Sequence, residues 1–270
     1  MNKHLLVTIS NESSAFYGVR FVMSFFTNKK DIKITLFYVE QSTKELNKTK
    51  EAEPLESLKL ATELLTGAGF PSSNIETKVA ERRFGIVKDI VQEGHRGLYD
   101  AVVLGRRGYL AFEGILGTST SREILDARID FPVWICKRSS SLRRHIIVAT
   151  DGSEASLRIA DHVGFMIADE DHTVTVCHVG DMSPQSENIV NKAVEAILIN
   201  GVDKERVSTE IIPGKKPAEI LLNKMKTSNS LVLAIGRSKP KEGTLWSWLT
   251  GSCSSKLLSD FESGALWISK

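Results

Sequence analysis

One stretch of this sequence has the residue types and spacing to bind a phosphate. Glycines and hydroxyl side chains gather in the segment 105–121, GRRGYLAFEGILGTSTS, between an apolar run and a helix-like run. Glycine lets a ligand approach the backbone closely, and a helix N-terminus offers unpaired N–H groups to an anion. The stretch indicates an anion cradle, in which Thr118, Ser119 and Thr120 cap the helix or bind a phosphate oxygen. A plain turn followed by a helix cap stays open as the alternative.

The composition excludes several other functions. The chain of 270 residues is 41% hydrophobic and 25% charged, which is typical of a soluble globular protein, and no apolar run is long enough to span a membrane. A net charge of +2 lacks the broad basic footprint of nucleic-acid binding. The cysteines are far apart and the histidines form no close pair, so we expect no metal site. We expect a cytoplasmic protein.

The chain contains the same pattern twice. HLLVTISNESS begins at His4 and HIIVATDGSEAS begins at His145, while FPVWICK at 131–137 matches GALWISK at 264–270. The offset stays between 131 and 141 residues, which indicates a duplicated domain rather than a short repeat. The predicted domains are residues 1–137 and 145–270, joined by a polar linker at 138–144.

Each half alternates β-branched apolar runs with amphipathic runs. Strands are predicted at 4–10, 32–39, 74–79, 100–104 and 131–136, and at 145–150, 173–179, 206–212, 230–235 and 264–269. Helices are predicted at 13–27, 53–68, 85–96 and 118–127, and at 153–168, 186–200, 217–227 and 251–260. This alternation predicts an α/β fold with a doubly wound parallel sheet in each half, and ligands bind such sheets where the strand order reverses.

Several motifs resemble those of the universal stress protein family. The spacing G-x2-G-x8-G-T at 105–118 is close to the family signature G-x2-G-x9-G-(S/T). The segment VATDGSEAS at 148–156 resembles the family's first strand with its Asp-Gly-Ser turn. The segment IIPGKKPAEILLNKMK at 211–226 resembles its third strand, glycine turn and third helix. The resemblance covers nearly the whole chain and indicates a tandem universal stress protein.

The resemblance implies a five-stranded parallel sheet of order 3-2-1-4-5 in each half, with the halves paired through their last strands. Such an internal pseudo-dimer leaves a further homodimer open. Trp134 and Trp267 would then lie near the pseudo-twofold axis, or each would simply fill the core of its own half.

The resemblance also implies an adenine nucleotide, ATP or AMP, with or without magnesium. The aspartate after the first strand would contact the nucleoside, the end of the second strand would receive the adenine, and the glycine signature would hold the phosphates. In the first half the implied nucleotide-binding residues are Ser10, Val39, Gly105, Arg106, Gly108, Gly117, Thr118 and Ser119. In the second half they are Asp151, Val179, Gly236, Arg237, Gly251 and Ser252.

Each half departs from the family pattern in a different way. The first half keeps the glycine loop but has Ser10 where the second half has Asp151. The second half has Lys239 followed by Pro240 in place of the second signature glycine, and proline has no N–H for a phosphate. This difference slightly favours the first half for phosphate binding. Asp151 is also a residue type that caps helices, so a purely structural role stays open.

Three functions follow as hypotheses. The first is a non-enzymatic, nucleotide-binding stress or regulatory protein. The second is a protein-interaction module without nucleotide, in which Trp246 and Trp248 on the loop 240–250 meet a protein partner. The third, a slow ATPase, is least favoured because no general base or pair of metal-binding carboxylates is recognisable.

Overall fold

The computed structural model describes residues 2–11, 15–40, 54–105, 129, 131–138, 143–236, 256–257 and 260–269. The chain divides into two compact units, Met1–Lys137 and Arg138–Lys270. Within the described residues, no helix is long and apolar enough to cross a membrane.

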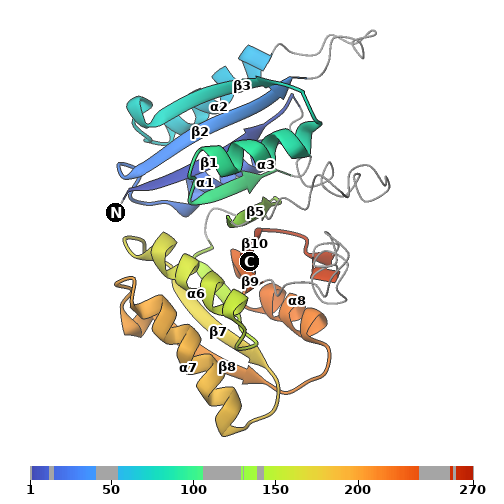
Figure 1. The fold of residues 1–270 in the computed structure, drawn as a ribbon. Coiled ribbons are helices and arrows are strands. Elements are labelled where there is room, and N and C mark those ends of the chain that lie inside the picture. Colours follow the sequence, from blue (N-terminus) through green and yellow to red (C-terminus); the bar gives the residue numbers. More distant parts are fainter. Residues whose placement is uncertain are drawn as a thin grey trace. The chain divides into compact units, whose positions relative to one another are not determined.

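The first unit is a parallel sheet with helices between its strands (Figure 1). Its elements are β1 (Lys3–Ile9), α1 (Phe16–Phe25), β2 (Ile32–Glu40), α2 (Pro54–Gly67), the short 3-10 helix η3 (Ser72–Asn74), β3 (Ile75–Glu81), α3 (Ile86–Arg96), β4 (Ala101–Leu104) and β5 (Val133–Cys136). The strands lie in the order β3-β2-β1-β4-β5, and every neighbouring pair is parallel.

The second unit repeats this arrangement. Its elements are β6 (His145–Ala149), α6 (Glu154–Ile167), β7 (Thr173–Val179), α7 (Pro184–Leu198), the 3-10 helix η5 (Lys204–Arg206), β8 (Val207–Ile212), α8 (Pro217–Thr227), β9 (Val232–Gly236) and β10 (Ala265–Ser269). The order β8-β7-β6-β9-β10 is again 3-2-1-4-5 within the unit, and all pairs are parallel. The predicted doubly wound fold of each half is therefore confirmed.

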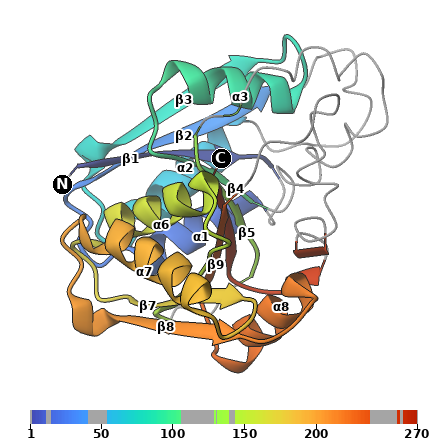
Figure 2. The same ribbon diagram turned by 60° about the horizontal axis from the view of Figure 1, so that its bottom comes forward.

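Helices cover both faces of each sheet, which explains the continuously apolar central strands. Figure 2 shows β1, β2 and β3 between α3 on one side and α1 and α2 on the other. Right-handed crossovers produce this division, because the chain moves outward from β1 to β3 and then returns to β4. All four residues of β4 are accordingly buried, whereas the edge strand β3 is largely exposed.

The two units also share side-chain details. His4 Nε2 lies 2.9 Å from Thr35 Oγ1 in the first unit, and His145 Nε2 lies 2.8 Å from Thr175 Oγ1 in the second. An equivalent position between the third strand and the following helix holds an ion pair in both units, with the charges exchanged: Lys78–Glu93 and Glu210–Lys224. Duplicated hydrogen bonds support a duplicated fold more specifically than strand order alone.

Each of the two aligned tryptophans is fully buried and packs within its own unit. Trp134 lies 5.9 Å from the ring of Phe21 and 5.8 Å from that of Phe25, both on α1. Trp267 lies 5.6 Å from the ring of His162 on α6. Core packing therefore accounts for both residues, while the pairing of the units through their last strands stays a prediction.

Candidate functional site

The strand order reverses between β6 and β9 in the second unit, and Asp151 lies at the carboxyl end of β6. Gly152 follows with φ +80°, and Ser153 is the N-cap of α6, with its Oγ accepting a hydrogen bond from Ser156 N. Asp151 is therefore not the helix cap that the sequence left open. Its Oδ1 instead accepts the Ser153 N–H at 3.0 Å, which closes an Asx turn and leaves the side chain exposed.

The surroundings keep the Asp151 carboxyl group ionised. Partial burial raises its pKa, but hydrogen bonds from the Ser153 hydroxyl, the Ser153 backbone and the Ser156 hydroxyl outweigh that effect. The net result is a pKa below the ordinary value of 3.8. A charged carboxylate at a switch point is a strong acceptor for a pair of ligand hydroxyl groups.

Gly236 ends β9 directly against the first turn of α6. A Cβ atom at this position would lie 2.2 Å from Ser156 N and 2.3 Å from the carbonyl carbon of Ala155. Only glycine allows the helix N-terminus to come so close to the strand end. The resemblance implies that Gly236 belongs to a phosphate loop. The structure shows that glycine is also needed at this position for α6 to pack against β9, with or without a ligand.

Val179, expected beside an adenine, is the last residue of β7, next to β6. The preceding residue, His178, spans the two strand ends, because its Nδ1 lies 2.8 Å from the carbonyl oxygen of Thr150. Gly180 follows, and its N–H donates to the Ile212 carbonyl of β8 at 3.1 Å. Asp151, His178 and Val179 therefore lie around one edge of the sheet.

The first unit has a less polar counterpart of this edge. Ser10 follows β1, and its Oγ is buried without a hydrogen-bond partner among the described residues. Asn11 Oδ1 accepts the Ser57 hydroxyl of α2 at 3.0 Å, so this amide oxygen is already engaged. Gly105 follows β4, with its N atom 3.7 Å from the position of a Cβ at Gly18 of α1. Val39 lies near the end of β2, where it pairs with Ala80.

The remaining predicted site residues lie outside the described residues. In the first unit these are Arg106, Gly108, Gly117, Thr118 and Ser119, and in the second unit Arg237, Gly251 and Ser252. Trp246 and Trp248 of the loop 240–250 also lie outside them. The phosphate-binding half of the hypothesis therefore stays a prediction.

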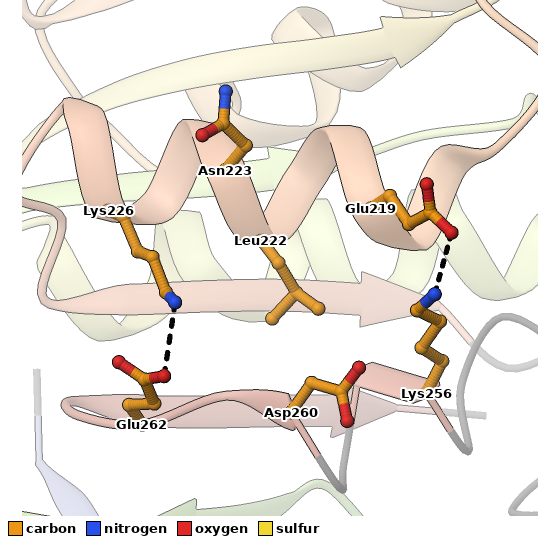
Figure 3. Close-up of a pocket in the computed structure, with 7 residues that line it drawn as sticks. All are labelled: Glu219, Leu222, Asn223, Lys226, Lys256, Asp260 and Glu262. Atoms are coloured by element: carbon orange, nitrogen blue, oxygen red, sulfur yellow. Dashed lines mark hydrogen bonds and ion pairs between the residues drawn. The ribbon is translucent and has the colours of Figure 1, made fainter.

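A separate hollow of about 530 Å³ lies between α8 and residues Lys256, Asp260 and Glu262. Figure 3 shows Leu222 between two ion pairs, Lys256–Glu219 at 2.6 Å and Lys226–Glu262 at 3.1 Å. Hydrogen bonding to Glu219 raises the pKa of Lys256, and the same contact lowers the pKa of Glu219. The two ion pairs engage both lysines that line the hollow, and Asp260 adds a third carboxylate.

Comparisons with known proteins place the fold. No family model matches the sequence, and no curated protein matches it. A universal stress protein from Archaeoglobus fulgidus DSM 4304 has 20% identity and a TM-score of 0.71, with 99% of this chain and 96% of that chain covered. A functionally unknown protein from Pseudomonas aeruginosa PAO1 has 16% identity and a TM-score of 0.56, with 100% and 92% covered.

A universal stress protein solved in complex with cAMP has 18% identity and a TM-score of 0.40, covering 47% of this chain and 96% of that chain. The full-length match and the repeated strand order agree with the resemblance found in the sequence. Each half of this chain has the universal stress protein fold.

Proposed function

We propose that this protein binds an adenine nucleotide as a non-enzymatic regulatory protein, with the nucleoside at the carboxyl edge of the second unit. The observation that carries the proposal is Asp151, an exposed and ionised carboxylate at the switch point. Ser153 caps α6, so the Asp151 side chain is not needed as the helix cap. An ionised carboxylate can accept hydrogen bonds from both ribose hydroxyl groups. The Ser153 N–H donates to Oδ1, and an ionised carboxylate has about four acceptor sites on its two oxygens.

The rest of the edge supports the same ligand. Val179 ends β7 beside Asp151 and Gly180 follows it, so a base attached to that ribose would meet backbone and a half-buried imidazole. Gly236 brings the N-terminus of α6 to the edge, and its positive dipole end favours an anion. A regulatory effect requires that the nucleotide have different affinities for two states of the protein.

The first test asks what the purified protein carries. The full chain is purified without added nucleotide and denatured, and the released small molecules are separated by ion exchange with mass detection. Stoichiometric ATP or AMP would support the proposal. Incubation with ATP and magnesium, followed by assay of released phosphate, tests the non-enzymatic part, for which we expect intact ATP.

Calorimetry of the full chain with ATP tests which residues contribute to nucleotide binding. Asp151→Asn keeps the shape and removes the charge, and we expect binding roughly tenfold weaker because charged hydrogen bonds exceed neutral ones by about 1–2 kcal/mol. Gly117→Val is the matching change in the first-half glycine loop. If only Gly117→Val weakens binding, the nucleotide lies in the first half. A protein that is empty and binds no ATP would favour the interaction module instead.

A further inference from the structure

The imidazole of His178 is held in one tautomer by the strand next to it. A carbonyl oxygen only accepts hydrogen bonds, so the 2.8 Å contact with Thr150 O requires the proton on Nδ1. In the neutral ring, Nε2 then carries the lone pair and is an acceptor. Because Thr150 immediately precedes Asp151, the same bond ties the ring to the turn that carries the carboxylate.

A glycine at position 180 is required for this position of the ring. A Cβ at Gly180 would lie 2.4 Å from His178 Nε2 and 3.0 Å from the Cδ2 atom of the ring. The space that a side chain would occupy at position 180 is therefore the space that Nε2 faces. Among the described residues, nothing donates a hydrogen bond to Nε2, and the His178 side chain is half-buried.

We infer that His178 is a specificity-determining residue that reads the exocyclic amino group of the nucleobase through Nε2. This inference rests on the proposed function, which brings the base to the end of β7. An amino group at position 6 of a purine donates to the lone pair, whereas an oxo group would set one acceptor against another. The residue therefore selects adenine over a 6-oxopurine, and Gly180 is the glycine that permits the selection.

The test compares ATP with ITP in calorimetry of the full chain at pH 8. The two bases differ by the amino or oxo group at position 6 and by the proton that the 6-oxo base carries on N1. We expect the native protein to bind ATP at least tenfold more tightly than ITP. His178→Phe keeps a ring of similar size but has no acceptor, so ATP should bind about tenfold more weakly while ITP is almost unchanged. His178→Gln has an amide oxygen near the former Nε2 and should recover part of the preference.

Tyr38→Phe is the matched control, because Tyr38 stands in β2 of the first unit where His178 stands in β7. It should leave the ratio of the two affinities unchanged. An unchanged ratio in His178→Phe, with Asp151→Asn still weakening ATP, would overturn the inference and leave the proposed function standing. If the native protein binds neither nucleotide, the proposed function itself fails. Circular dichroism of each variant shows whether it is folded.

Discussion

At the scale of single residues, Gly236 carries a packing requirement that is separate from any ligand. Gly236→Ala would push a methyl group into the backbone of Ala155 and Ser156, and neither backbone can move without shifting the start of α6. We expect a loss of about 3 kcal/mol in the free energy of unfolding, near the upper end of overpacking costs. Urea denaturation without nucleotide measures it.

Gly67 offers the matched glycine, because it ends α2 and a Cβ there would meet nothing within 4 Å. Gly67→Ala should be neutral or stabilise the protein by up to about 1 kcal/mol, since alanine is the better helix former. Equal losses for the two substitutions would contradict the packing argument for Gly236.

His162 makes the stability of the second unit depend on pH. Burial in α6 lowers its pKa from 6.5 to about 3, so the unfolded chain takes up the proton first as the pH falls. The free energy of unfolding should therefore fall as the pH drops from 6.5 toward 3, with His162 contributing about 1.4 kcal/mol per pH unit. Above pH 6.5 both states are neutral and this contribution is constant.

His162→Leu removes the titratable imidazole and places an apolar side chain beside Trp267. Urea denaturation at several pH values between 4.5 and 6.5 should give a shallower decline for this variant than for the native protein. His4 and His145 also have pKa values lowered by burial and by a nearby lysine, so some decline should persist. Identical slopes in the two proteins would show that His162 is not the buried neutral base described here.

The sequence predicted the candidate site only in part, because residue type does not determine local geometry. Asp151 and Ser153 are both residue types that cap helices, and the backbone around Gly152 decides that Ser153 does so. The position of His178 at the end of a predicted strand indicates a pocket-lining or core role, and the sequence does not decide between the two. Its contact with Thr150 depends on the register of β6 and β7, which emerges only on folding.

At the scale of elements, the ion pair between the third strand and the next helix differs between the units in burial. Glu93 has a side chain only 6% exposed and also accepts the Tyr99 hydroxyl, whereas the Glu210 side chain is 40% exposed. Lys78→Met would leave the Glu93 charge buried with one hydrogen bond. We expect a loss of about 2 kcal/mol, below the cost for fully buried pairs because Lys78 reaches solvent.

Glu210→Gln is the matched change in the second unit and should cost less than about 1 kcal/mol, as for exposed pairs. Urea denaturation of both variants gives the comparison. A larger loss of unfolding free energy for Glu210→Gln than for Lys78→Met would contradict the conclusion that the more buried charge lies in the first unit.

Strand and helix positions were the most predictable features. Apolar runs indicate where each element lies, and glycines, prolines and capping residues indicate where it begins and ends. The helix predicted at 186–200 begins earlier, at Pro184, because Ser183 caps it and proline suits the first turn. The 3-10 helices η3 and η5 were not predicted, since three polar residues show no periodicity. The predicted helix 118–127 lies outside the described residues, as does most of 251–260.

At the scale of the whole molecule, two units with separate buried cores permit a ligand to act on one of them. Among the described residues, only the second unit combines an ionised aspartate with the His178 acceptor, so we expect one ATP per chain. A ligand at 100 times its Kd stabilises the native state of the unit that holds it by about 2.7 kcal/mol. Unfolding of such a chain need not be two-state, so a measurement that resolves the units is required.

Hydrogen–deuterium exchange of the full chain, read by mass spectrometry of peptides with and without saturating ATP, separates the units. Amides of β6, β7 and the start of α6 should exchange more slowly with ATP, while those of β1 and β2 should change little. The same experiment with Asp151→Asn at the same ATP concentration should lose most of this protection. Protection confined to β1 and β2 would move the nucleotide to the first unit, where Ser10 is the buried hydroxyl without a partner among the described residues.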